Sequence, residues 1–220
     1  MRHLPKAILW DLDGTIIDST ECHYQSWVNA LKSHGYSITR DLFNANFGRN
    51  NQTSLSIFLG FKPDPKLSNQ IIQEKEHLFR AEVPEIGSMV PGVNTWLTTA
   101  KQMGIRQAIA SSAGMKNITT MFSVFELLGY FDLLVSGANL PAKPEPDVFL
   151  AAADLLKLPP EGCVVIEDSV AGVEAAKRAG MACIAVVTSH VKSQLASADI
   201  IVDDFTTPFL DAIRSLGLDD

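Results

Sequence analysis

Two aspartates separated by one residue follow the first apolar run of the sequence, in the stretch Asp11-Leu12-Asp13-Gly14-Thr15. In an extended chain, residues two apart point the same way, so Asp11 and Asp13 are expected to face one cavity. Two carboxylates about 4 Å apart repel each other by roughly 4 kcal/mol at an effective dielectric of about 20. The pair therefore calls for a bound metal ion, a shared proton or a nearby lysine. The alternative is a surface turn with two solvated acids, because Asp-Gly is a common turn signal.

A second acidic pair, Glu167 and Asp168, follows the apolar run Cys163–Ile166. A carboxylate is costly to bury without a partner, so two acidic clusters at the ends of apolar runs favour a hard cation between them. Mg²⁺ fits this pattern, since it prefers oxygen ligands and usually keeps several water molecules and substrate oxygens. A helix cap by Asp168 or Ser169 is the alternative interpretation.

Residues that could bind an anion complete the set. Ser111 and Ser112 follow the apolar run Ile105–Ala110, and hydroxyls and backbone N–H groups there could hold an anion beside the metal. Two nearby prolines restrict the backbone around Lys143, which is therefore presented in a defined place. The serines could instead be ordinary helix caps, and the lysine could be a solvated residue before a helix.

The elements that must position these residues alternate between two kinds. Short, continuous apolar runs are typical of strands buried on both faces of a parallel sheet. From residue 91 onward they alternate with amphipathic stretches of helical length, which predicts a Rossmann-like wound α/β core. Ligands bind such sheets outside the carboxyl ends of the strands, where the polar residues fall. The expected strands are Ala7–Trp10, Ile105–Ala110, Leu133–Ser136, Cys163–Ile166, Cys183–Val187 and Ile200–Val202, and the expected helices are Val93–Met103, Asn117–Leu128, Asp147–Leu158 and Val170–Gly180.

Residues 19–84 interrupt this alternation, since they contain no convincing strand. Helical patterns are found instead at Thr20–Ser33, Thr53–Leu59 and Lys66–Ala81. We therefore expect an α/β core domain formed by residues 1–17 and 86–220, with a small all-helical cap domain, residues 18–85, inserted after the first strand. The composition places hinges at Thr15–Ser19 and Val83–Pro91.

Composition limits the partners. The 220 residues carry 18 Lys and Arg against 25 Asp and Glu, a formal charge of −7, which argues against a nucleic-acid or anionic-membrane partner. No apolar run approaches the roughly 18 residues of a membrane span. Three scattered cysteines (Cys22, Cys163 and Cys183) indicate free thiols in a reducing compartment, so a cytoplasmic location is expected, and a monomer is the default.

The four polar elements, in this order and at strand ends, resemble the haloacid dehalogenase-like superfamily of phosphotransferases. The resemblance covers Ala7 to about Val187, and within the superfamily the chain is similar to β-phosphoglucomutase-like phosphatases. The helical insertion resembles the mobile cap of that family. The stretches that carry the resemblance are Trp10-Asp11-Leu12-Asp13-Gly14-Thr15, Ala110-Ser111-Ser112, Lys143-Pro144-Glu145-Pro146-Asp147-Val148-Phe149 and Ile166-Glu167-Asp168-Ser169-Val170-Ala171-Gly172-Val173.

The resemblance implies a role for each matched residue. Asp11 would be the nucleophile that forms an aspartyl-phosphate, and Asp13 would protonate the leaving alcohol and then deprotonate the attacking water. Ser111 and Lys143 would hold the transferring phosphoryl group. The Mg²⁺ site would comprise Asp11, Asp13 through its backbone carbonyl, and Asp168, with Glu167 in support. An acid two residues after the nucleophile favours phosphate esters over carbon–halogen bonds, because an alkoxide needs a proton to leave and a halide does not.

Substrate contacts are expected from the cap and from the segment after Ser112. His23 and Trp27 are four residues apart and would share one helix face, in a stretch that mutases of this family place over the active site. The alternative for Trp27 is a place in the core of the cap. Arg49 and Asn51 lie where the mutases carry an arginine for the distal phosphate of a sugar bisphosphate, but here Asn51 takes the matching place. The remaining expected contacts are Ser112 and Lys116.

Three functions are compatible with these residues. The first is a Mg²⁺-dependent phosphatase of a small phosphorylated metabolite, with a sugar phosphate favoured. The second is a β-phosphoglucomutase, which needs a second cationic clamp that the sequence has only in altered form. The third is a signalling receiver module, which also combines acidic residues, a hydroxyl and a lysine around an aspartate. The helical segment 19–84 speaks against the receiver.

Overall fold

The computed structural model describes residues 4–218 and divides them into two compact units. The core unit runs to Asp18 and resumes at Met89, and the helical unit is Ser19–Ser88. We had expected the divisions at residues 17 and 86, so the observed borders lie close to them. Residues 1–3 and 219–220 of the expected core ranges lie outside the described residues.

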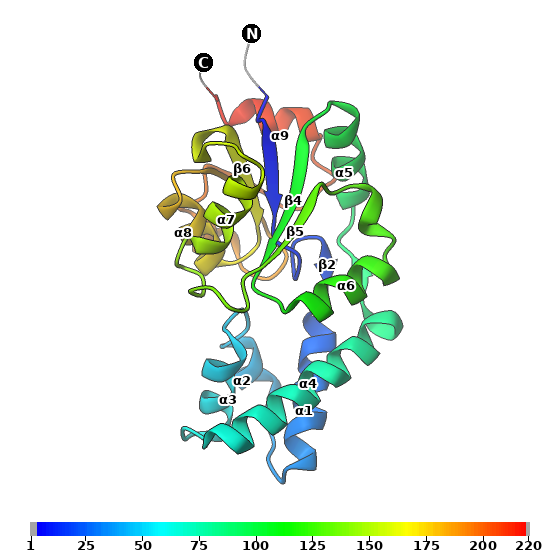
Figure 1. Cartoon of the computed structure of the whole chain (residues 1–220), viewed down its shortest axis with the longest axis vertical. Coiled ribbons are helices and arrows are strands. Elements are labelled where there is room, and N and C mark those ends of the chain that lie inside the picture. The colour runs from blue at the N-terminus through cyan, green and yellow to red at the C-terminus, as the bar shows by residue number, and fades with distance from the viewer. Residues whose placement is uncertain (1–3, 219–220) are drawn as a thin grey trace. The chain divides into compact units, whose positions relative to one another are not determined.

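The core unit is built on a six-stranded sheet in the order β5-β4-β1-β6-β7-β8, in which every neighbouring pair is parallel (Figure 1). The predicted wound parallel sheet is therefore confirmed. Strand β1 lies between β4 and β6, so the order of strands reverses at β1, and ligands bind at such a switch point. The strands are β1 (Ala7–Trp10), β4 (Arg106–Ser111), β5 (Leu133–Ser136), β6 (Cys163–Glu167), β7 (Ala182–Val186) and β8 (Ile200–Val202).

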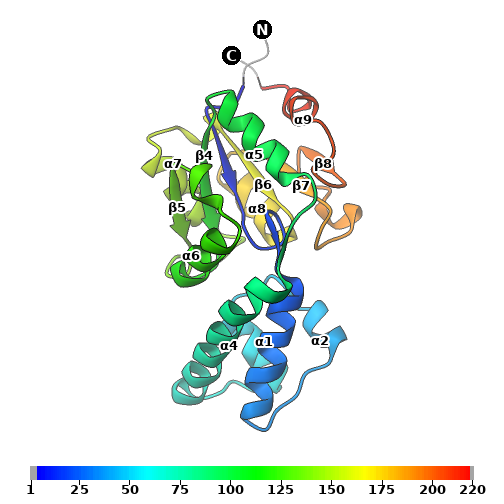
Figure 2. The same cartoon turned by 90° about the vertical axis from the view of Figure 1, so that its right-hand side faces the viewer.

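Helices cover both faces of this sheet. Alternate residues of β1 face opposite sides: Ala7 and Leu9 join the apolar cluster beneath α7 and α8, whereas Trp10 packs with Phe205 on the other side, where Trp96 of α5 also lies. Figure 2 shows α5 and α8 on opposite faces of the sheet. Burial on both faces explains why the strands are continuous apolar runs. The helices are α5 (Val93–Gln102), α6 (Met115–Val124), α7 (Asp147–Leu155), α8 (Val170–Arg178) and α9 (Phe209–Ser215).

Element ends differ from the sequence expectations by a few residues. Helix α6 begins two residues earlier than expected and ends at Val124, after which the short 3-10 helix η1 (Leu127–Gly129) takes over. Helix α9 had not been predicted, because seven residues are too few to show a helical period clearly. Two further 3-10 helices are η2 (Pro160–Gly162) and η3 (Lys192–Leu195).

The helical unit contains α1 (Thr20–Ser33), α2 (Arg40–Asn44), α3 (Asn51–Leu59) and α4 (Pro65–Ile86) around an aromatic-rich core. Asp64 begins α4 by accepting hydrogen bonds from two backbone N–H groups, with a proline at the first helical position. The two-residue strands β2 (Ile17–Asp18) and β3 (Ser88–Met89) flank the unit.

The expected hinge at Val83–Pro91 was wrong in its first part, because α4 continues through Pro84 to Ile86. Proline removes one backbone donor, yet the helix still closes with the bond from Gly87 N to Val83 O. Across residues 4–218, the helices are all too short or too polar to cross a lipid bilayer.

Candidate active site

The register of the sheet brings the predicted residues to one edge. Trp10 lies opposite Ile109 of β4 and Ile166 of β6, so the residues that follow each of these leave the sheet together. The backbone N–H of Asp11 donates to the carbonyl of Ile166 at 3.0 Å, which extends the pairing one residue past β1. Parallel strands therefore place the first aspartate, the serines at the end of β4 and the acids at the end of β6 at the same edge of the sheet.

A buried lysine pairs two of the acids. Lys143 Nζ donates to Asp11 Oδ1 at 2.6 Å and to Glu167 Oε1 at 2.7 Å. The side chains of Lys143 and Asp11 are only 8% and 10% exposed, and Glu167 is fully buried. The ammonium also lies 4.8 Å from the centre of the Phe149 ring, a cation–π contact. The interpretation of Lys143 as a solvated surface residue is therefore excluded.

Glu167 is fixed from behind by the N-terminus of α8. Its Oε2 accepts hydrogen bonds from the backbone N–H groups of Asp168 and Ser169 and from Ser169 Oγ, at 2.8 to 2.9 Å. A Cβ at Gly172 would lie 1.7 Å from Oε1, so only glycine leaves room for this carboxylate. Both oxygens are thus engaged, and Glu167 acts on Lys143. Ser169 is also the helix cap, accepting from Gly172 N, which leaves Asp168 free of that role.

Asp168 is the third buried acid at this edge, at 3% exposure. Thr15 Oγ1 donates to its Oδ1 at 3.0 Å. Gly14 has a φ of +83°, and a Cβ there would lie 2.1 Å from Asp168 Oδ2. Gly14 therefore meets two needs at once, the left-handed backbone of the turn and the close approach of the carboxylate. The sequence had indicated the turn and had assigned no role to Thr15.

Two of the three buried acids, Asp11 and Asp168, resist ionisation. Burial raises the pKa of Asp11 to about 7, although Lys143 opposes the shift, and the negative charges of Glu167 and Asp13 add to it. Burial also raises the pKa of Asp168 well above its ordinary value, with further contributions from Glu167 and Asp11. The mutual repulsion shows that these carboxylates, and Asp13, are close enough to interact.

This donor set fits a hard divalent cation. Two buried carboxylates with raised pKa values are stabilised by positive charge beside them, and oxygen ligands are those that Mg²⁺ prefers. Within residues 4–218, however, no group of three His, Cys, Asp or Glu side chains is arranged to hold a metal ion alone. The fit is therefore to an ion that completes its coordination with backbone carbonyls, water and substrate oxygens.

The anion-binding candidates lie along the neighbouring strand end. Ser111, the last residue of β4, is 1% exposed, and its Oγ accepts from the backbone N–H of Ala113 at 3.1 Å. Helix α6 begins after Gly114 without a side-chain cap, so neither serine has the capping role that was the alternative. Ser112 and Lys116 are exposed.

Of the four substrate contacts predicted in the helical unit, three residues contact other side chains of that unit and the fourth is exposed. His23 stacks on Phe79 with ring centres 4.1 Å apart, and Trp27 is 3% exposed and packs against Phe58. The core position of Trp27 favours the packing interpretation over substrate contact. Asn51 Nδ2 donates to Glu76 Oε1 at 2.9 Å, whereas Arg49 is exposed.

Lys75 in α4 is a residue that sequence analysis missed. It is 1% exposed, and its ammonium donates to Glu76 Oε1 at 2.8 Å and to His23 Nδ1 at 3.0 Å. Since an ammonium can only donate, Nδ1 of His23 must accept. Burial raises the pKa of Glu76, but Lys75 and Asn51 outweigh it and lower that pKa below its ordinary value. A lysine on an amphipathic helix gives no sequence signal of such burial.

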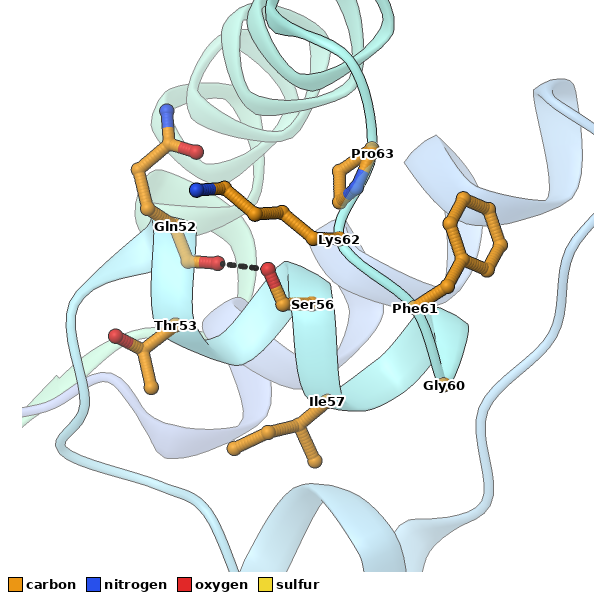
Figure 3. Close-up of a pocket in the computed structure, with 8 residues that line it drawn as sticks. All are labelled: Gln52, Thr53, Ser56, Ile57, Gly60, Phe61, Lys62 and Pro63. Atoms are coloured by element: carbon orange, nitrogen blue, oxygen red, sulfur yellow. Dashed lines mark hydrogen bonds between the residues drawn. The ribbon is translucent and has the colours of Figure 1, made fainter.

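A pocket of about 540 Å³ lies elsewhere in the helical unit, along α3 and the loop that follows it (Figure 3). Figure 3 shows the hydrogen bond from Ser56 Oγ to the Gln52 carbonyl in its wall. Its only charged lining residue is Lys62, and it contains none of the predicted site residues. The buried acids and Lys143 lie instead at the sheet edge of the core unit. The pocket is lined by Gln52, Thr53, Ser56, Ile57, Gly60, Phe61, Lys62 and Pro63.

The chain is similar to known proteins over most of its length. The family model for haloacid dehalogenase-like hydrolases matches residues 8–186. The chain is 30% identical to Beta-phosphoglucomutase of Bacillus subtilis, over 90% of this chain and 88% of that protein. It is also 30% identical to Hexitol phosphatase A of Escherichia coli, over 90% of each. Protein SUPPRESSOR OF QUENCHING 1, chloroplastic, of Arabidopsis thaliana is 34% identical over 97% of this chain, which spans only 21% of that protein.

Proposed function

This chain belongs to the haloacid dehalogenase-like hydrolase family, and on that premise we propose that it is a Mg²⁺-dependent phosphatase of a small phosphorylated metabolite, with a sugar phosphate favoured. Relatives that include a hexitol phosphatase and a β-phosphoglucomutase support a phosphoryl-handling enzyme. The observation that carries the proposal is the buried contact of Lys143 with Asp11 at 2.6 Å, which holds an ammonium beside the proposed nucleophile.

The proposed reaction has two steps. In the first, an Asp11 carboxylate oxygen attacks phosphorus, and Asp13 gives its proton to the leaving alkoxide, which leaves as the alcohol. In the second, Asp13 takes a proton from water, whose oxygen attacks the phosphorus of the aspartyl-phosphate. The P–O bond to Asp11 then breaks, which releases phosphate and restores both carboxyl groups.

Positive charge must offset the repulsion between a carboxylate and a phosphate dianion. Lys143 supplies part of it: although burial lowers its pKa, Asp11 and Glu167 raise that pKa further, so the ammonium stays protonated. Ser111 is proposed to donate to the transferring group. Mg²⁺, held by Asp11, Asp168 and the Asp13 carbonyl with Glu167 in support, would supply further positive charge at the phosphoryl oxygens when bound.

Contacts to the rest of the substrate are also proposed. His23, Arg49, Asn51, Ser112 and Lys116 are candidates, to be tested one by one through the Michaelis constant. The three cysteines are free and buried, which supports work in a reducing compartment, with the cytoplasm proposed.

A panel of phosphate monoesters tests the proposal. Phosphate release should require added MgCl₂, stop with EDTA, and fall by at least about a thousandfold in Asp11→Asn. Asp154→Asn, a matched change on the exposed side of α7, should leave the activity unchanged. Release that survives Asp11→Asn would refute the nucleophile, and release that is independent of Mg²⁺ would refute the metal.

β-Phosphoglucomutase activity is the second candidate, favoured by the Bacillus subtilis relative. Against it, Asn51 stands where the mutases carry a phosphate-binding arginine, and its amide is bound to Glu76. Conversion of β-glucose 1-phosphate to glucose 6-phosphate, stimulated by the bisphosphate, would support a mutase, and hydrolysis alone would count against it. The match to the haloacid dehalogenase-like hydrolase family speaks against the third candidate, the signalling receiver module.

A further inference from the structure

A loop that the sequence analysis did not single out lies against the acidic edge. It is Thr188–His190, which follows β7 (Ala182–Val186). Because Glu167 lies opposite Ala185, the chain beyond β7 leaves the sheet beside the end of β6. This loop, the β7 loop, therefore belongs to the same edge of the sheet as the proposed catalytic residues.

The β7 loop is hydrogen-bonded to both acidic turns. Thr188 Oγ1 donates to the carbonyl of Gly14, in the turn that follows Asp11. His190 Nδ1 donates to the backbone carbonyl of Asp168 at 3.2 Å. Since carbonyl oxygens only accept, the direction of both bonds is fixed. The loop thus links the turn after β1 to the turn after β6.

The residue between them, Ser189, has a buried hydroxyl that meets the full geometry of a hydrogen bond with no residue in the range 4–218, although it lies close enough to Asp168 to lower the pKa of that carboxyl. Its location is given by Gly14: a Cβ there would lie 2.6 Å from Ser189 Oγ and 2.1 Å from Asp168 Oδ2. The Ser189 hydroxyl and the Asp168 carboxylate therefore both lie next to the α-carbon of Gly14. A buried unpaired hydroxyl costs about 1–3 kcal/mol, so such a group calls for an explanation.

We propose that Ser189 is a positioning residue of the cation site: its hydroxyl donates to Asp168 Oδ2 when the cation is bound and holds that carboxylate in its binding orientation. Thr15 already donates to the other oxygen, Oδ1. With both hydrogen bonds formed, each oxygen of the Asp168 carboxylate would accept from one hydroxyl. The inference rests on the proposed function, because it takes Asp168 as a ligand of the ion. Residues that orient metal ligands typically contribute about 10–100-fold to metal affinity.

Metal binding by the EDTA-stripped protein tests this directly. The probe is Mn²⁺, which accepts the same oxygen ligands and whose free-ion paramagnetic resonance signal disappears on binding, with Mg²⁺ as competitor. Ser189→Ala should raise the dissociation constants of both ions by about 10–100-fold. Ser189→Thr keeps the hydroxyl and should stay near wild type. Ser215→Ala is the matched control, since it removes a hydroxyl that donates to Asp211 O on α9.

A second readout separates positioning from packing. In EDTA, Ser189→Ala removes an unpaired buried group, so its urea midpoint should not fall below that of the wild type. If Ser189→Ala does not fold, Ser189→Cys keeps the volume, has only a weak donor and should show the same loss of ion binding. Unchanged ion affinity in a folded Ser189 variant would overturn the inference alone. A wild-type chain that binds neither ion would refute the metal of the proposed function, and this inference with it.

Discussion

Replacing Asp11 by asparagine should stabilise the metal-free protein at neutral and alkaline pH. Burial raises the pKa of Asp11 from 3.8 to about 7, and Glu167 and Asp13 reinforce the shift that Lys143 opposes. Between these two pH values the folded chain keeps a proton on Asp11 that the unfolded chain has released. The free energy of unfolding therefore falls as pH rises through this window.

The magnitude follows from the size of the shift. A difference of about 3 pKa units, at 1.36 kcal/mol each, is a loss of about 4 kcal/mol from Asp11 alone once the pH exceeds about 7. Asparagine has nearly the same shape and no charge, so it does not suffer this loss. The variant should match the wild type near about pH 4 and exceed it by about 4 kcal/mol above about pH 7. Relief of Asp168, whose pKa Asp11 also raises, adds to the gain.

Urea unfolding in EDTA at a series of pH values measures the difference directly. Asp154→Asn serves as the control, because Asp154 is exposed and has no comparable burial. Its difference from wild type should stay near zero across the series. A difference between Asp11→Asn and wild type that does not grow with pH, or that favours the wild type above about pH 7, would show that Asp11 is not buried among like charges.

Added Mg²⁺ should reverse the comparison. An ion that binds the folded chain stabilises it by RT ln(1 + [L]/Kd), and the wild type offers one carboxylate more than the variant. The advantage of Asp11→Asn at neutral pH should therefore shrink as MgCl₂ is added. An advantage that persists at saturating Mg²⁺ would mean that the ion does not use Asp11.

Three further substitutions test the edge of the sheet. Gly14→Ala should weaken Mn²⁺ binding and lower the urea midpoint more than Gly104→Ala, because both glycines have positive φ but only Gly14 has a carboxylate 2.1 Å from the added Cβ. Lys143→Met should abolish phosphate release and cost about 3–5 kcal/mol in urea unfolding at neutral pH by leaving buried acids unpaired, whereas loss of an exposed lysine pair costs about 1 kcal/mol or less. Gly172→Ala should lower both the free energy of unfolding and the turnover, because the added Cβ would collide with the Glu167 carboxylate. In an ordinary helix the same change stabilises the protein by about 1 kcal/mol.

The sheet was predictable because its signal is local. Strands buried on both faces must be continuous apolar runs, and each such run formed a strand within about a residue of its expected ends. The grouping of Asp11 and Glu167 follows from the same fact, since the ends of parallel strands share one edge, whereas Lys143 reaches them from the loop between β5 and α7. Helix α9 and the continuation of α4 through Pro84 depend on packing and on the last helical turn, which a residue pattern does not specify.

Contacts made by ordinary surface residue types were beyond the sequence. Lys75 lies on an amphipathic helix, where lysines usually face solvent, yet it is buried between His23 and Glu76. Ser189 follows a strand in a segment without any motif. In both cases the partner is remote in sequence, so only the packed chain specifies the contact. The apolar core can be predicted from composition, whereas the placement of polar groups depends on tertiary structure.

The charges at the sheet edge also constrain the order of binding. Asp11, Glu167 and Asp168 lie at the same edge of the sheet, where Lys143 pairs with Asp11 and Glu167, and the pKa values of Asp11 and Asp168 are raised. A phosphate dianion adds negative charge to an edge that has an excess of it, so its affinity for the metal-free protein should be low. A cation that relieves the acids also attracts the phosphate, and by linkage the phosphate must then tighten the cation by the same factor. Under the proposed function, ion and substrate therefore bind cooperatively, because the carboxylates that hold the ion are the ones that repel the substrate.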